Sequence, residues 1–242
     1  MSRRHLPGIA MGLMAVTILS APSLLCPAPV QAQSRHLETG TYGMQAAVGT
    51  LADKEGLGYR ADVAFSISGI LDVGLLAMNK TVDHEQFRTL DTESFMPYAR
   101  MFFIRPDEYS HVFVAITTAF RRVAFAGDSL VVNDQGLSSL DFLLGISLHG
   151  KIPTRGSWEF QPGAGVDNIF SQERLAYGAN AAHFVDVNDV RIWADLTLAR
   201  QIGAGRRLLV TPGVQYNGRY FTYNLDIGWA FAFPRRDFEP WR

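Results

Sequence analysis

The chain has 242 residues, of which 48% are hydrophobic, 12% aromatic and 19% charged. Lys and Arg number 22 against 23 Asp and Glu, a formal net charge of -1 that excludes a strongly basic chain, so we expect no nucleic-acid partner. The hydrophobic fraction excludes a mostly disordered protein. The length suits a single all-β domain, and no apolar run after residue 32 reaches the roughly 18 residues of a transmembrane helix.

The N-terminal segment has the three parts of an export signal. Two arginines precede the apolar stretch 9–21, and the small residues of Val30-Gln31-Ala32 suit a signal peptidase. We therefore predict a cleaved signal peptide at residues 1–32 and one domain at residues 33–242. Cys26 is the only cysteine, so the mature chain cannot form a disulfide.

The C-terminal part of the chain alternates with a period of two. From residue 221 to 233 the odd positions are all large and apolar, whereas the even positions are polar or small. Successive side chains of a strand point to opposite sides, so this pattern predicts a strand between two different environments. Similar segments recur upstream, and together they predict an all-β protein of about ten antiparallel strands, with eight or twelve as alternatives.

The connections between these segments give a second prediction. Asn217-Gly218 is a strong signal for a two-residue hairpin turn, which would pair Tyr216 with Arg219 and Leu208 with Ile227. The other connections alternate in length: short links near 68–70, 105–110, 150–156 and 203–206, and long loops near 81–92, 124–136 and 169–188. With ten strands, all the short links fall on the side of both termini, as in outer-membrane barrels.

Two kinds of barrel fit this alternation. In a soluble lipocalin-like barrel the apolar row would face inward, whereas in a membrane barrel it faces lipid. The last strand, of at least 13 residues, is long enough to cross an apolar band of about 25 Å. The polar face is rich in small residues and poor in lysine, unlike a soluble surface. These features favour a single antiparallel up-and-down transmembrane β-barrel.

The end of the last strand carries a family resemblance. Asp226-x-Gly228-x-x-Phe231-x-Phe233 resembles the C-terminal assembly signal of bacterial outer-membrane β-barrels, although residues 234–242 follow it here. The mature chain is also similar in size and pattern to small porin-like and surface-antigen barrels. The resemblance implies a location in the bacterial outer membrane, contact with outer-membrane lipid and recognition by the barrel-assembly machinery.

The polar row should fill the lumen with charged side chains. These are Arg60, Asp62, Asp72, Arg100, Arg121, Asp141, Glu159, Asp167, Arg191, Asp195 and Asp226. A barrel of about ten strands leaves little room for water, so we expect these charges to pair with one another. The interpretation is a largely plugged lumen with a structural or surface-exposed role. A narrow, cation-leaning diffusion channel is the alternative, because seven of these eleven groups are acidic.

A hydrolase at the rim of the barrel, acting on a lipid or an ester, is a further alternative. Gly127-Asp128-Ser129-Leu130 resembles the opening motif of GDSL esterases, but the Asp-x-x-His partner of that family is missing, since Asn180 precedes His183 by three positions. Ser147 and His149 could also serve such chemistry. We predict no enzyme, no catalytic or metal-binding residue and no cofactor.

Overall fold

A computed structural model describes residues 42–54, 56–84, 88–103, 112–127, 135–154, 156–177 and 181–233. These residues form ten long strands and one strand of two residues. The strands are β1 (Gly43–Asp53), β2 (Gly56–Ile67), β3 (Leu71–His84), β4 (Arg88–Phe103), β5 (Val112–Ala126), β6 (Gln135–Gly150), β7 (Ile152–Pro153), β8 (Trp158–Tyr177), β9 (Ala181–Gly203), β10 (Arg206–Tyr216) and β11 (Phe221–Ala232). Within the described residues, no helix is long and apolar enough to cross a membrane.

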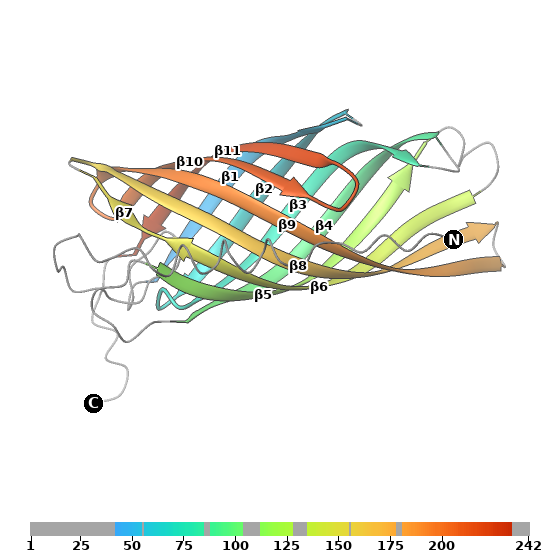
Figure 1. The fold of residues 1–242 in the computed structure, drawn as a ribbon, viewed down its shortest axis with the longest axis horizontal. Coiled ribbons are helices and arrows are strands. Elements are labelled where there is room, and N and C mark those ends of the chain that lie inside the picture. Colours follow the sequence, from blue (N-terminus) through green and yellow to red (C-terminus); the bar gives the residue numbers. More distant parts are fainter. Residues whose placement is uncertain are drawn as a thin grey trace, which may run out of the picture.

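The long strands follow one another around a closed antiparallel barrel (Figure 1). Closure comes from β1 and β11, which pair from Gly43 opposite Ala232 to Ala52 opposite Tyr223. Each long strand otherwise pairs with its neighbours in sequence, and β7 adds only a short ladder beside β8. The predicted up-and-down antiparallel barrel of ten strands is therefore confirmed.

The apolar row of each strand points out of the barrel. On β11, Leu225 is 48% exposed and Trp229 is also exposed, whereas Thr222 and Asp226 on the alternate positions are buried. On β6, Leu144 is likewise 47% exposed. A soluble lipocalin-like barrel would turn these residues inward, so that alternative is wrong.

The outward positions of β9 mark the height of the apolar band. Asp186 and Asn188 are polar, the outward positions from Val190 to Leu198 are apolar, and Arg200 is charged again. The strand between Asn188 and Arg200 is about 40 Å long, which a tilt of about 40° converts into a height of about 30 Å. This height suits a bilayer, and it leaves the first residues of β9 above the lipid.

The predicted register of the last hairpin is wrong by two residues. Tyr216 pairs with Phe221, and Leu208 pairs with Trp229 rather than with Ile227. The reason is the side chain of Asn217, whose Oδ1 accepts hydrogen bonds from the backbone N–H groups of residues 219 and 220, both at 3.1 Å. These bonds stabilise a four-residue loop. Because the strand period is two, the shift leaves every side chain on its predicted face.

Two of the predicted long loops are mainly strand. Residues 169–188 belong to β8 and β9 apart from 178–180, and residues 81–92 belong to β3 and β4 apart from 85–87. The β8–β9 ladder continues without interruption up to Tyr177 opposite Ala181. These segments have polar sequences because they continue past the lipid as strands exposed to water. Both segments lie at the predicted end of the barrel, opposite the end where Gly43 pairs with Ala232.

The outward row yields a stability prediction. We expect Leu225→Arg to destabilise the barrel by about 2–4 kcal/mol, because the guanidinium would enter hydrocarbon near mid-strand. Asn188→Arg places the same side chain on the same outer face but above the apolar band, and its effect should be close to zero. Urea unfolding in phospholipid vesicles measures both. Equal effects of the two substitutions would contradict the assigned band.

Candidate functional site: the polar lumen

The charged side chains of the polar row lie on the inner face of the barrel. Asp72, Asp141, Asp167 and Asp226 are buried. The remaining members are partly buried: Arg60, Asp62, Arg100, Arg121, Glu159, Arg191 and Asp195. Their inward direction follows from the same alternation that turns the apolar residues toward lipid.

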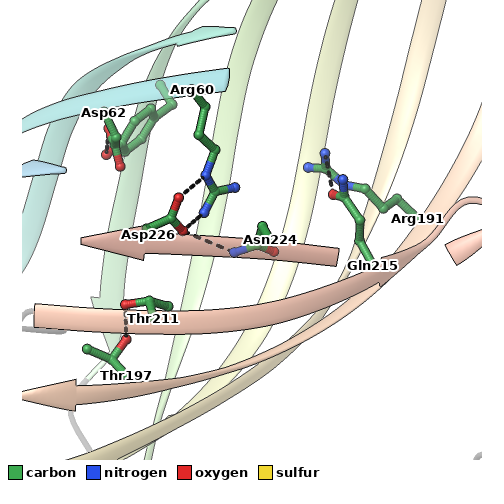
Figure 2. A network of polar contacts seen from close by, with 9 residues as sticks. Arg60, Asp62, Arg191, Thr197, Thr211, Gln215, Asn224 and Asp226 are labelled. Atoms are coloured by element: carbon green, nitrogen blue, oxygen red, sulfur yellow. Dashed lines mark hydrogen bonds and ion pairs between the residues drawn. The ribbon is translucent and has the colours of Figure 1, made fainter. Parts of the chain in front are cut away.

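Arg60 and Asp226 form the central ion pair of this lumen (Figure 2). The Nε of Arg60 donates to Oδ1 of Asp226 at 2.5 Å, and its Nη2 donates to Oδ2. Asn224 donates to the same carboxylate at 3.0 Å. This two-pronged contact joins β2 to β11 across the closing strand β1, and thereby ties the two sides of the barrel closure together.

Gly49 on β1 makes this ion pair possible. In register it lies between Arg60 on β2 and Asp226 on β11, so the two side chains meet above it. A β-carbon at Gly49 would overlap Oδ1 of Asp226 and would lie 2.5 Å from the carbonyl oxygen of Leu225. The absence of a side chain at this position therefore lets a contact span three strands.

Tyr98 makes a second contact of this kind. From β4 it crosses Gly74 on β3, and its hydroxyl donates to Oδ1 of Asp62 on β2 at 3.0 Å. A β-carbon at Gly74 would lie 2.6 Å from Cζ of Tyr98. Arg100, also on β4, lies directly opposite Asp72 and donates to Thr117 at 3.2 Å.

Two other pairs join directly opposed residues of adjacent strands. Arg121 on β5 donates to Asp141 on β6 at 2.5 Å, and Arg191 on β9 donates to Asp167 on β8 at 2.6 Å. Arg191 also reaches Gln215 at 3.4 Å (Figure 2). Each of these carboxylates is thus neutralised by an arginine, as desolvation in a narrow lumen requires.

Four rings lie together inside the barrel, toward the end that holds Gly43 and Ala232. We call Phe102, Phe113, His149 and Trp193 the aromatic plug. Phe102 lies 5.5 Å from Phe113 and 5.7 Å from His149, His149 lies 5.6 Å from Phe113, and His149 lies 5.9 Å from Trp193, as distances between ring centroids. The rings come from β4, β5, β6 and β9, and β8 is the only long strand between the last two.

Further inward side chains are packed together at this end. Thr197 and Thr211 share a hydrogen bond of 2.9 Å, and Ala199, Leu209 and Ala230 form a buried apolar cluster beside it. On the other side of the plug the lumen holds a cavity of about 500 Å³, which extends from Trp193 to the ion pairs and to Tyr220 near the opposite rim. Figure 1 shows the long hairpins at that rim.

Sequence reasoning missed the aromatic plug and the role of the glycines, although both left a signal. Tyr98, Phe113 and Trp193 interrupt the small and polar residues of the inner row. A large ring on the inner face needs space on a neighbouring strand, and inward glycines provide it. Gly165, for example, lies opposite Trp193, and a β-carbon there would lie 2.7 Å from the indole ring.

The structure describes only some of the residues considered for a hydrolase. Ser147 Oγ and His149 Nε2 are 2.8 Å apart, and Oδ1 of Asp195 approaches the same point above Gly163 as Nδ1 of His149. Ser147 is only 5% exposed and His149 only 2%, so this group is enclosed in the plug and offers no room to a substrate. Asp128, Ser129 and the side chain of His183 lie outside the described residues. Among those described, no group of three potential ligands could hold a metal ion.

The residues that resemble an assembly signal lie at the end of β11. Gly228 faces inward beside Ala47, while Phe231 and Phe233 lie close to the barrel closure. The backbone N–H of Phe233 donates to the carbonyl of Tyr42 at 2.8 Å, and its ring lies 6.1 Å from that of Phe65. The motif therefore occupies the strand that closes the barrel, with Asp226 and Gly228 on the inner face and the two phenylalanines at odd, outward positions.

An antiparallel barrel with an apolar outer belt and a charged lumen defines the class of outer-membrane β-barrels, and the chain has this fold. Among solved structures, the translocator domain of the autotransporter NalP from Neisseria meningitidis is similar, with a TM-score of 0.53 and 11% identity over 82% of this chain and 90% of that chain.

Two further barrels are similar at lower scores. The β domain of the Bordetella autotransporter BrkA has a TM-score of 0.43 and 12% identity, over 80% of this chain and 100% of that chain. The attachment invasion locus protein Ail of Yersinia pestis has a TM-score of 0.40 and 9% identity, over 81% of this chain and 99% of that chain. No protein-family model and no curated protein matches the sequence.

The glycine beneath the central ion pair gives a second prediction. Gly49→Ala should destabilise the barrel by about 1–3 kcal/mol, because the new methyl group would displace Asp226 from Arg60. Gly136→Ala is the matched control, since a β-carbon there meets nothing closer than 3.9 Å, and it should change the free energy of unfolding by less than about 0.5 kcal/mol. Urea unfolding followed by tryptophan fluorescence measures both. A neutral Gly49→Ala would rule out the three-strand contact.

Proposed function

We propose that this protein is a non-conducting barrel of the bacterial outer membrane with a structural or surface-exposed role. The aromatic plug is the observation that carries this proposal. Each of its four rings lies within 6 Å of at least one other, centroid to centroid, toward one end of the lumen. A pathway for solutes would require these rings to separate.

The charged lumen supports the same proposal. In a conducting pore, charged side chains line a water-filled path and remain available to solutes. Here Asp141, Asp167 and Asp226 each accept hydrogen bonds from an arginine. The inner charges therefore act mainly to hold neighbouring strands together, as in a structural network. A hydrolase is not favoured, because the enclosed Ser147 and His149 are closed to a substrate.

We further propose that the long hairpins face the cell exterior and both termini face the periplasm. The tight turns near Gly69 and Gly205 lie at the same end of the barrel as the two termini. Outer-membrane barrels typically have short periplasmic turns and longer extracellular extensions. A signal peptide at residues 1–32, outside the described residues, and the assembly signal ending at Phe233 would direct export and insertion.

Single-channel recording tests the closed lumen. The wild-type protein in planar lipid bilayers should be electrically silent, and the double variant F102A/W193A should show discrete openings, because it removes two rings of the aromatic plug. Phe103→Ala removes a neighbouring ring that points outward and should remain silent. Steady conductance of the wild-type protein would instead support the narrow diffusion channel.

Labelling on intact cells tests the orientation. The mature chain has no cysteine if residues 1–32 are removed, so single cysteines can be placed freely. Asn188→Cys, on the exposed extension of β9, should react with a membrane-impermeant maleimide, whereas Ala204→Cys, in the turn between β9 and β10, should react only after lysis. The opposite pattern would reverse the topology.

A further inference from the structure

The rim formed by the long hairpins, at the end of the barrel opposite the termini, is uneven. The ladder between β8 and β9 extends to Tyr177 opposite Ala181, whereas the ladder between β9 and β10 ends at Ile192 opposite Tyr216. In Figure 1 the β10–β11 hairpin accordingly ends well short of the β8–β9 hairpin. In the described structure, residues 181–191 of β9 therefore pair with a strand on one side only. We call this segment the free edge.

The free edge has unused hydrogen-bonding capacity over about 35 Å of strand. Each strand residue offers a backbone donor and an acceptor, and those on the open side of a strand are available to another chain. Most of the free edge lies above the apolar band, where Asp186 and Asn188 face outward. An incoming strand would therefore meet it in water, not in hydrocarbon.

The side chains along the free edge combine apolar and acidic groups. Phe184 and Val185 are exposed on opposite faces, as expected for neighbouring strand residues. Asp186 accepts a hydrogen bond from Gln172 at 3.2 Å and faces outward, while Asp189 faces the lumen side. Glu173, opposite Val185 on β8, adds a third acidic group. The arginines here are Arg174, which lies opposite Phe184, and Arg191, which is paired with Asp167.

We propose that the free edge binds an extended segment of another polypeptide, which adds to the sheet as one more strand. Backbone hydrogen bonds would supply general affinity, and alternate side chains would supply specificity. Because Asp186 and Asp189 are three residues apart, their cross-strand partners are three residues apart as well. The fitting segment therefore carries two basic residues at that spacing, among β-branched or aromatic residues.

A second copy of the barrel in the same membrane fits this edge poorly. A two-fold axis along the membrane normal would make two strands, each tilted by about 40°, cross at about 80° rather than run side by side. The termini of the described chain, Tyr42 and Phe233, lie at the other end of the barrel. The partner is thus another polypeptide that approaches from the side of the long hairpins, and its cellular location rests on the proposed orientation.

Peptide binding to the purified full-length barrel in detergent micelles tests the proposal without depending on that orientation or on conductance. The probe is a fluorescent, end-capped peptide of about ten residues, with alternating valine and threonine and two lysines three positions apart. It should bind, and hydrogen exchange should slow in residues 181–191 and not in β1. The same peptide with N-methylated backbone amides should not bind, because it cannot form the ladder.

Charge variants test the acidic contribution. D186N/D189N should weaken peptide binding by about three- to tenfold, and raised salt should do the same. Asp91→Asn is the matched control, because Asp91 is also exposed but lies on β4 between two paired strands, and it should leave binding unchanged.

Three results would overturn the proposal. These are the absence of binding, protection that appears outside residues 181–191, and equal binding by D186N/D189N and by the wild-type protein. Slow exchange at the free edge without peptide, together with a dimer in micelles, would show that a second copy occupies it instead.

Discussion

Closure of the sheet is the constraint on which the rest of the structure depends. Hydrocarbon offers no hydrogen bonds, so every backbone N–H and C=O at membrane depth needs a partner within the protein. The pairing of β1 with β11 removes the last open edge of the sheet at that depth. Once the sheet is closed, alternate side chains of each strand point outward to the lipid or inward to the lumen. The position of a residue along its strand therefore decides which of the two environments it meets.

The narrow lumen then determines how its polar residues are arranged. Partly buried charges are stabilised by pairing, and a barrel of ten strands brings the side chains of its inner face close together. Arg60 therefore reaches Asp226 across Gly49, and Tyr98 reaches Asp62 across Gly74. A glycine on the strand between two partners leaves the space that their side chains occupy. The same principle lets Trp193 pack into the aromatic plug beside Gly165.

Outside the lipid the closure constraint no longer applies, and the barrel becomes asymmetric. Water can form hydrogen bonds with the backbone groups of an open strand edge. The strands β8 and β9 therefore extend beyond the rim at which β10 and β11 end. The proposed closure of the lumen by the aromatic plug agrees with the proposed strand addition at the free edge. Both proposals would place the contacts of this protein with other molecules at its exposed rim rather than along its axis.

The sequence by itself determined the class of fold, the face of each strand residue and the side of the barrel on which each connection lies, because a period of two is visible in the residues alone. It predicted Leu225 outward and Asp226 inward correctly. It could not predict the register of the last hairpin, because the bonds made by the side chain of Asn217 decide the loop length, and a shift of two residues leaves the pattern unchanged. Nor could it distinguish loops from exposed strands in residues 169–188, since both are polar. Which charges pair, and which rings pack together inside the barrel, depends on the order and stagger of the strands, and these are visible only in the tertiary structure.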